Sequence, residues 1–342
     1  MAEPIHSPAI QRLSAAIHYI PGSRLLYINN PKVACTNVKW AMVEAFAPEA
    51  APGMTSFGAI HRRAETPFAK GPGLAQALRD RSFTVFSMVR HPRRRFVSAY
   101  FNKIHGPQHP TGPRILESIG LHPKRSHPPK AVLKGLLNLP TQDINGHVAP
   151  QVVNLFWGSI PYDRVFRLET LKGKSDPLIF DGFHLPMVDK SLHSTQGKTD
   201  LSLFDAEDYE MIDHLYQADY AAFGYQPDPA APVSELVDLP PFRPFLLDLL
   251  TAEKPLSVLK ARFGIGPIGM IQQKLAATPP DLTLLEAGAI LDCLFKLRRL
   301  DTLPPRLLQE VERQATVTPE NAARLHWLRA QLAGRQTDEV AG

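Results

Sequence analysis

A strand–loop–helix pattern that occurs twice in the first third of the chain most constrains the fold. An apolar run at residues 25–28 enters a polar loop at 31–37, after which a helical pattern continues to residue 46. A second apolar run at 83–89 ends at Arg90, and apolar residues then recur at helical spacing. Strands that alternate with helices in this way are typical of an α/β fold with a parallel sheet flanked by helices.

The first loop has the composition of an anion-binding site that lacks the usual glycines. Backbone N–H groups at a helix start point toward one place, and the helix dipole favours negative charge there. Lys32 would add a full positive charge, and Thr36 and Asn37 are good N-cap types that can also reach a phosphate oxygen. The residues assigned to this candidate site are Pro31, Lys32, Val33, Ala34, Cys35, Thr36 and Asn37.

The second strand–helix unit supplies a second candidate anion site. Pro92 suits the first helical position, because the N–H that proline lacks would have no partner there. Helical spacing places Arg95 and Ser98 about one turn apart on a shared side. Two anion sites at the ends of two strands, the second beginning at Arg90, predict a ligand with two phosphate groups.

These residues resemble the sulfotransferases that use 3′-phosphoadenosine 5′-phosphosulfate (PAPS). Within that group they are most similar to the carbohydrate branch, sulfotransferase family 2, which includes the chondroitin, dermatan and heparan O-sulfotransferases. The first loop is similar to that branch's 5′-phosphosulfate loop. The pattern Arg90-x-Pro-x-x-Arg-x-x-Ser-Ala-Tyr, which ends near Lys103, is similar to its 3′-phosphate motif. Further similar blocks follow in the family's order at residues 147–151, 162–165, 168–171 and 216–225. The resemblance implies a P-loop-like nucleotide-binding core with a parallel sheet over residues 23–227.

The resemblance also implies a reaction, the transfer of a sulfuryl group from PAPS to a hydroxyl of a saccharide, polysaccharide or glycolipid. Lys32 would stabilise the charge that develops on the leaving bisphosphate, and backbone amides of residues 33–37 would hold the 5′-phosphosulfate. Arg90 and Ser98 would bind the 3′-phosphate, Arg90 through its planar guanidinium. This scheme requires no metal.

One more segment resembles the family's flexible cofactor-covering loop. It spans residues 193–198, and Ser194 and Lys198 would reach the nucleotide from it. An ordinary surface turn around a glycine is the alternative interpretation.

An acceptor alcohol needs a base, because it is a poor nucleophile until its proton is removed. His61 lies between the two phosphate units, where related heparan enzymes carry a catalytic histidine, and His147 belongs to the similar block at 147–151. Both are candidates, although any one of the 13 histidines is more often structural. Glu169 matches a family position and is interpreted as structural, as a carboxylate that ends a strand often is.

The arginines after Arg90 have simpler interpretations. Arg93 and Arg94 are expected on a solvated helix face, and Arg95 is expected to form a structural ion pair.

Composition restricts the partners and the compartment. A net charge of +5 suits a polyanionic cofactor or an acidic acceptor, and no zinc-finger, RNA-recognition or basic-zipper pattern supports nucleic acid as the partner.

The two cysteines, Cys35 and Cys293, form no disulfide framework, which favours a reducing compartment. No apolar run approaches the roughly 20 residues of a membrane span, and residues 1–11 lack a secretory signal. We therefore expect a bacterial, cytoplasmic enzyme without a transmembrane segment, unlike the anchored Golgi relatives, with peripheral membrane contact left open.

Proline clusters divide the chain. The predicted parts are a leader (1–22), the catalytic domain (23–227), a proline-rich linker (228–241), a helical C-terminal domain (242–334) and a tail (335–342). The helical domain is interpreted as a dimerisation or stabilising module, through which a homo-oligomer would form. Residues 106–129, rich in proline, glycine and histidine, are expected to form a long surface loop and to edge the acceptor site.

Two other classes of protein remain as alternatives. A nucleotide-kinase-like phosphotransferase would also have a phosphate cradle, but Gly-x-x-x-x-Gly-Lys-Ser/Thr is absent and the enzyme would require magnesium. A sugar- or nucleotide-binding protein that has lost catalysis would bind nucleotide without turnover. The joint presence of Lys32, Arg90 and Ser98 argues against it.

Overall fold

The structure is a computed structural model. It describes residues 13, 15–54, 57–61, 66–69, 78, 81, 83–105, 110–139, 144–171, 176–187, 201–240 and 242. The chain divides into two compact units, one of residues 12–157 and 161–241 and the other of residues 1–11, 158–160 and 242–342. The first unit contains the elements described below. The predicted helical domain and tail lie, from residue 243 onward, outside the described residues.

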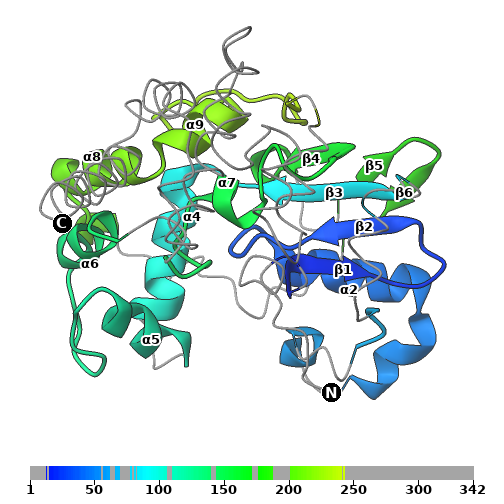
Figure 1. The fold of residues 1–342 in the computed structure, drawn as a ribbon, viewed down its shortest axis with the longest axis horizontal. Coiled ribbons are helices and arrows are strands. Elements are labelled where there is room, and N and C mark those ends of the chain that lie inside the picture. Colours follow the sequence, from blue (N-terminus) through cyan, green and yellow to red (C-terminus); the bar gives the residue numbers. More distant parts are fainter. Residues whose placement is uncertain are drawn as a thin grey trace, which may run out of the picture. The chain divides into compact units, whose positions relative to one another are not determined.

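A four-stranded sheet forms the centre of this unit. Its strands are β1 (Ile17–Tyr19), β2 (Leu25–Ile28), β3 (Thr84–Val89) and β4 (Arg164–Arg167), in the order β1-β2-β3-β4. β2, β3 and β4 run parallel, whereas β1 runs antiparallel to β2 (Figure 1). The predicted α/β class with parallel strands is confirmed. β1 lies within the segment assigned to a leader, so the sheet begins before Ser23.

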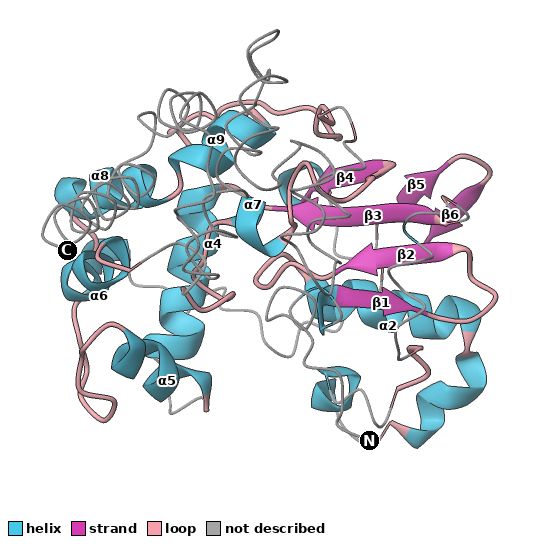
Figure 2. Ribbon diagram, viewed as in Figure 1, coloured by secondary structure: helices cyan, strands magenta, loops and turns pink. Residues whose placement is uncertain are grey.

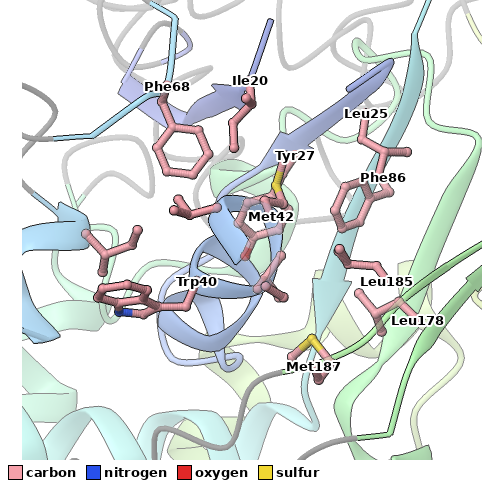
Figure 3. Packing of buried hydrophobic residues seen from close by; sticks show 14 of the residues in the cluster. Ile20, Leu25, Tyr27, Trp40, Met42, Phe68, Phe86, Leu178, Leu185 and Met187 are labelled. Atoms are coloured by element: carbon pink, nitrogen blue, oxygen red, sulfur yellow. The ribbon is translucent and has the colours of Figure 1, made fainter. Parts of the chain in front are cut away.

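Helix α2 (Cys35–Phe46) covers one face of the sheet. Trp40 and Met42 of α2 pack in one apolar cluster with Tyr27 of β2 and Phe86 of β3 (Figure 3). The hairpin of β5 (Leu178–Phe180) and β6 (Phe183–Leu185) adds to the same cluster. Burying each large apolar side chain contributes about 1.5–3 kcal/mol, so the buried face of α2 holds its first turn firmly at the end of β2.

Six further helices lie in the described part of this unit. They are α4 (Pro92–Ala99) with a π-helical turn (Tyr100–Ile104), α5 (Thr111–Ser118), α6 (Pro129–Leu137), α7 (Gln151–Asn154), α8 (Ala206–Leu215) and α9 (Gln217–Phe223). All of them except α7 contribute side chains to a second apolar cluster, which includes Phe96, Tyr100 and Tyr216. Short 3₁₀ turns occur at Pro48–Gly53, Phe57–His61, Leu168–Thr170 and Leu201–Leu203.

Two segments differ from the expectation of loops or linkers. The predicted surface loop at 106–129 contains α5, whose Ile115 and Leu116 are buried; its Gly-Pro pair stands in the first turn and does not interrupt the helix. Within the predicted linker at 228–241, Leu236 forms a β-bridge with Phe166 of β4. Among the described residues, no helix has the length and apolarity needed to cross a membrane.

Candidate functional site

The ends of parallel strands β2 and β3 bring the two predicted anion sites together. The arrowheads of both strands point toward α7 and α4 in Figure 2, and the loop before α2 begins at the end of β2. Arg90 follows β3 directly, and its Nη1 lies 3.4 Å from the Lys32 carbonyl oxygen, a long contact. The loop and the start of the α4 unit therefore border one location.

The loop between β2 and α2 achieves without glycine a conformation that usually requires it. Lys32 and Ala34 both have left-handed backbones, with φ of 72° and 59°. Each such residue with a Cβ costs about 1–2 kcal/mol, and glycine would avoid this cost. Val33 between them is fully buried in the core, which offsets part of this strain and anchors the loop.

Helix α2 starts without a side-chain cap. Its N-cap residue is Ala34, which makes no capping hydrogen bond, and its first turn contains no acidic residue. The expectation that Thr36 or Asn37 caps the helix was wrong, because the left-handed Ala34 lets the helix begin at Cys35 and places both residues inside the first turn. A helix start with uncapped N–H groups and no carboxylate suits an anion.

Positive charges gather at this helix start. Burial, the largest cause, and the neighbouring charges of Lys103, Arg90 and Arg95 together lower the pKa of Lys32 to about 7, against an opposing effect of Cys35. Burial likewise lowers the pKa of Arg90 and of Lys103. Like charges held close together in a partly buried place would all be stabilised by one anion. Ser98 lies in α4 and is 9% exposed.

Arg95 holds the loop between β2 and α2 through carbonyl oxygens, and no carboxylate of the described residues forms the predicted ion pair with it. Its buried guanidinium donates to the carbonyl oxygens of Pro31 at 3.0 Å, Ala149 at 2.7 Å and Gly146 at 2.8 Å. The side chain thus joins the anion loop to the segment that carries His147. Arg94 is exposed, as expected.

Arg93 is also not a solvated side chain. Its Nε donates to Asp213 Oδ1 at 2.9 Å, and its Nη2 bonds the other carboxylate oxygen. The interpretation of Arg93 as part of a solvated face was therefore wrong, because α8 supplies a carboxylate beside it.

We expect Arg95→Met to lower the free energy of unfolding by about 3 kcal/mol, because a buried guanidinium is lost and the three carbonyl oxygens that it binds lose their donors. Chemical denaturation measures the change. Arg94→Met is the matched control, since it removes the same functional group from an exposed neighbouring position and should change stability by at most about 0.5 kcal/mol. Equal effects of the two substitutions would contradict the assigned role of Arg95.

His61 lies against the first turns of α2. Its Nε2 is 3.1 Å from Thr36 Oγ1, and its Nδ1 is 3.2 Å from Nζ of the buried Lys39. A lysine ammonium has no acceptor, so Nδ1 accepts from Lys39. A neutral His61 ring therefore carries its proton on Nε2, directed at Thr36.

His147 has the opposite tautomer. Asn145 Oδ1 accepts from the backbone N–H of His147 at 3.1 Å and lies 3.0 Å from His147 Nδ1. Because the same oxygen accepts from the backbone N–H, Nδ1 is a donor to it, and a neutral ring keeps its lone pair on Nε2. A Cβ added at Gly146 would lie 4.0 Å from Pro31 Cγ, which places the His147 segment beside the anion loop.

Glu169 accepts hydrogen bonds from a backbone N–H and from a tyrosine hydroxyl. Its Oε1 accepts from the backbone N–H of His91 at 2.9 Å, and its Oε2 accepts from the Tyr225 hydroxyl at 2.9 Å. His91 is buried, its Nε2–H donates to the Gln226 carbonyl oxygen at 2.7 Å, and burial lowers its pKa. This group holds the start of α4 in place.

Sequence reasoning did not single out Asn30 or Asp219 and assigned no role to Gln151. All three are fully buried and are joined by hydrogen bonds at the ends of β2 and β3. A pair of asparagines after an apolar strand, of which Asn30 is the second, was the available signal for Asn30. Ser194 and Lys198 lie outside the described residues. In the part of the chain that the structure describes, no group of three or more His, Cys, Asp and Glu side chains could hold a metal ion.

Comparison with known proteins identifies the family. Searches of curated proteins and of solved structures each returned no match. A family model described as the sulfotransferase family matches residues 17–226, which include every strand of the central sheet and both anion sites. This match supports sulfuryl transfer as the general activity. Since it covers more than half of the protein, the chain belongs to the sulfotransferase family.

Proposed function

We propose that this chain transfers a sulfuryl group from PAPS to a hydroxyl of a saccharide, polysaccharide or glycolipid. The observation that carries the proposal is the uncapped start of α2, with Lys32 beside Arg90 at the ends of two parallel strands. A nucleotide with phosphate groups at both its 3′ and 5′ positions offers an anion to each of these places.

The residues fit such a donor. The N–H groups of the first turn of α2 would hold the 5′-phosphosulfate, since no side chain caps them. Arg90 would bind the 3′-phosphate with two parallel N–H donors, and Ser98 of α4 would add a hydroxyl contact. A bound anion would also offset the burial and the repulsion that together lower the pKa of Lys32.

The reaction we propose is a direct in-line transfer. The acceptor oxygen attacks sulfur, the bond between sulfur and the bridging oxygen of the donor breaks, and the proton of the hydroxyl passes to a histidine. Negative charge grows on the bridging oxygen as it leaves. The Lys32 ammonium stabilises that charge, which makes its contribution larger in the transition state than in the ground state.

Of the two histidine candidates, His147 is the better base. Its Nδ1–H is held by Asn145, so Nε2 is the basic nitrogen. The Nδ1 lone pair of His61 accepts from Lys39, and its Nε2 carries the proton. Lys39 would therefore have to leave His61 Nδ1 before this nitrogen could accept a proton from the acceptor hydroxyl. We assign His61 the role of orienting the Thr36 hydroxyl.

Calorimetric titration with 3′,5′-adenosine bisphosphate tests the donor class. We expect binding in the absence of magnesium and its loss in Arg90→Ala, followed by label transfer from PAPS to carbohydrate acceptors. Absence of binding by the intact protein would refute the proposal. A requirement for magnesium would favour a phosphotransferase, and tight binding without turnover on any acceptor would favour a binding protein.

Proton uptake offers an independent test of Lys32. The free protein holds Lys32 with a pKa of about 7, below its ordinary value of 10.5, so between these two pH values the unfolded chain binds a proton that the folded protein lacks. The free energy of unfolding should therefore decrease as pH falls from 10.5 to about 7 and stay constant below that, as far as Lys32 determines it. A bound bisphosphate favours the ammonium and raises this pKa. At about pH 8, where phosphate is fully ionised, we therefore expect close to one proton taken up per ligand bound.

Titrations in buffers of different ionisation enthalpy measure this uptake. Lys32→Met removes the amino group and keeps the rest of an unbranched side chain, so it should abolish the proton uptake and make the remaining binding independent of buffer. Equal uptake in both proteins would assign the proton to another group and contradict the role of Lys32.

A further inference from the structure

A buried glutamine joins the ends of β2 and β3. The side-chain oxygen of Gln151 accepts from the Arg90 backbone N–H and from Asn30 Nδ2, each at 3.0 Å. Its side-chain nitrogen donates to the Arg90 carbonyl oxygen at 2.8 Å and lies 3.3 Å from Asp219 Oδ2. Gln151 has no exposed surface. Its amide is therefore surrounded by donors at the oxygen and by acceptors at the nitrogen, which fixes its orientation.

The contacts with Arg90 have the form of a strand pairing. The last residue pair between β3 and β4 is Val89 with Arg167, so Arg90 stands beyond the end of the ladder. The side-chain amide of Gln151 bonds both the N–H and the C=O of Arg90, as the backbone of a neighbouring strand would. One side chain thus continues the sheet by one residue and fixes the backbone from which the Arg90 guanidinium extends.

Other buried groups hold Gln151 in turn. Asp219 accepts from the backbone N–H groups of Gln151 and Val152, each at 2.9 Å, and so binds the first N–H groups of α7. Asn154, at the other end of α7, donates to Asn30 Oδ1 at 3.3 Å. Asn30 also donates to the Met88 carbonyl oxygen at 3.0 Å. The anion loop after Asn30 and the arginine after β3 are therefore tied to one helix.

We propose that Gln151 is a positioning residue that sets the place of Arg90 relative to the anion loop, and so matches the protein to the distance between the 3′- and 5′-phosphates of one nucleotide. This inference rests on the proposed function. The two phosphate groups are linked covalently through one ribose, so a protein that binds both must hold its two sites at a fixed spacing. Displacement of a positioned group by about 1 Å can cost about 10²-fold.

The test compares two ligands that differ only in the 3′-phosphate, namely 3′,5′-adenosine bisphosphate and adenosine 5′-phosphate. The dissociation constant of adenosine 5′-phosphate divided by that of the bisphosphate measures what the 3′-phosphate contributes to binding. A general loss of stability would not change this ratio. We expect Gln151→Met to reduce this ratio by about 10-fold or more, while the dissociation constant for the 5′-phosphate changes by less than about 3-fold. Arg90→Ala defines complete loss of the 3′-phosphate contribution.

Tyr162→Phe is the matched control. It removes a buried hydrogen bond to the Leu155 carbonyl oxygen, at 2.7 Å in the intact protein, and should leave the ratio unchanged. If Gln151→Met does not fold, Gln151→Asn takes its place, because the shorter amide cannot span to the Arg90 backbone while the backbone N–H bond to Asp219 remains.

The outcomes separate the two proposals. A wild-type protein that binds both ligands equally would refute the proposed function. A wild-type protein that prefers the bisphosphate, with a preference lost in Arg90→Ala and retained in the Gln151 variant, would refute the positioning role and leave the proposed function standing. Loss of the preference in both variants supports the inference.

Discussion

His147→Ala is expected to lower the rate of sulfuryl transfer by about 10²- to 10⁴-fold, the usual contribution of a positioned general base. The reason is the tautomer, since the hydrogen bond to Asn145 keeps the proton on Nδ1 and makes Nε2 the basic nitrogen of the ring. Binding of 3′,5′-adenosine bisphosphate should be unchanged, because the base contacts the acceptor and not the nucleotide. Single-turnover rates and titrations of the same preparation measure both quantities.

His61→Ala is the control for this experiment. His61 bonds Thr36 and Lys39, so its removal should weaken nucleotide binding more than it lowers the rate at saturating donor. If His61→Ala transferred the sulfuryl group slowly and His147→Ala did so at a nearly normal rate, His61 would be the base and His147 would not. This result would mean that Lys39 leaves His61 when the acceptor binds.

Lys32→Ala is expected to lower the rate by about 10²- to 10³-fold, the scale for loss of one donor that stabilises transition-state charge. The decrease should be seen in the rate at saturating donor, because charge on the bridging oxygen appears only as the sulfur–oxygen bond breaks. Lys32→Arg should restore part of the rate, since arginine keeps its charge at any pH used.

The choice of acceptor offers a further check on Lys32. The defect in Lys32→Ala should be the same for every acceptor hydroxyl, because the lysine acts on the leaving group. A defect that varied strongly between acceptors would place Lys32 at the acceptor and contradict the mechanism.

The strands and the helix that make up the anion site were predictable because their signals are local. The apolar run at residues 25–28 coincides with β2, and the helical pattern that follows coincides with α2 (Cys35–Phe46). The helix cap was not predictable in the same way. Thr36 and Asn37 have capping side chains, but the helix start was set by the backbone of Ala34, whose sequence identity gives no indication of a positive φ.

The roles of the buried polar residues depend on contacts between distant segments. Arg95 was expected to pair with a carboxylate and binds three carbonyl oxygens, because the turns that carry them meet only in the folded protein. Gln151 and Asp219 are 68 residues apart, and Asn30 and Gln151 are 121 apart. No periodicity or local motif indicates contacts between residues so far apart in the sequence. A single sequence therefore shows that these polar residues are present but not which residues they bind.

The glycine-free loop before α2 has a consequence for the thermodynamics of ligand binding. Residues with a Cβ have fewer backbone conformations than glycine, and Val33 fixes the middle of the loop in the core. The conformational entropy of this segment is therefore lost when the chain folds and is not lost again when a ligand arrives. A glycine-rich loop can adjust its backbone to anions of several shapes. The loop of this protein is rigid before the ligand binds, so it selects among anions by shape without a change in its backbone.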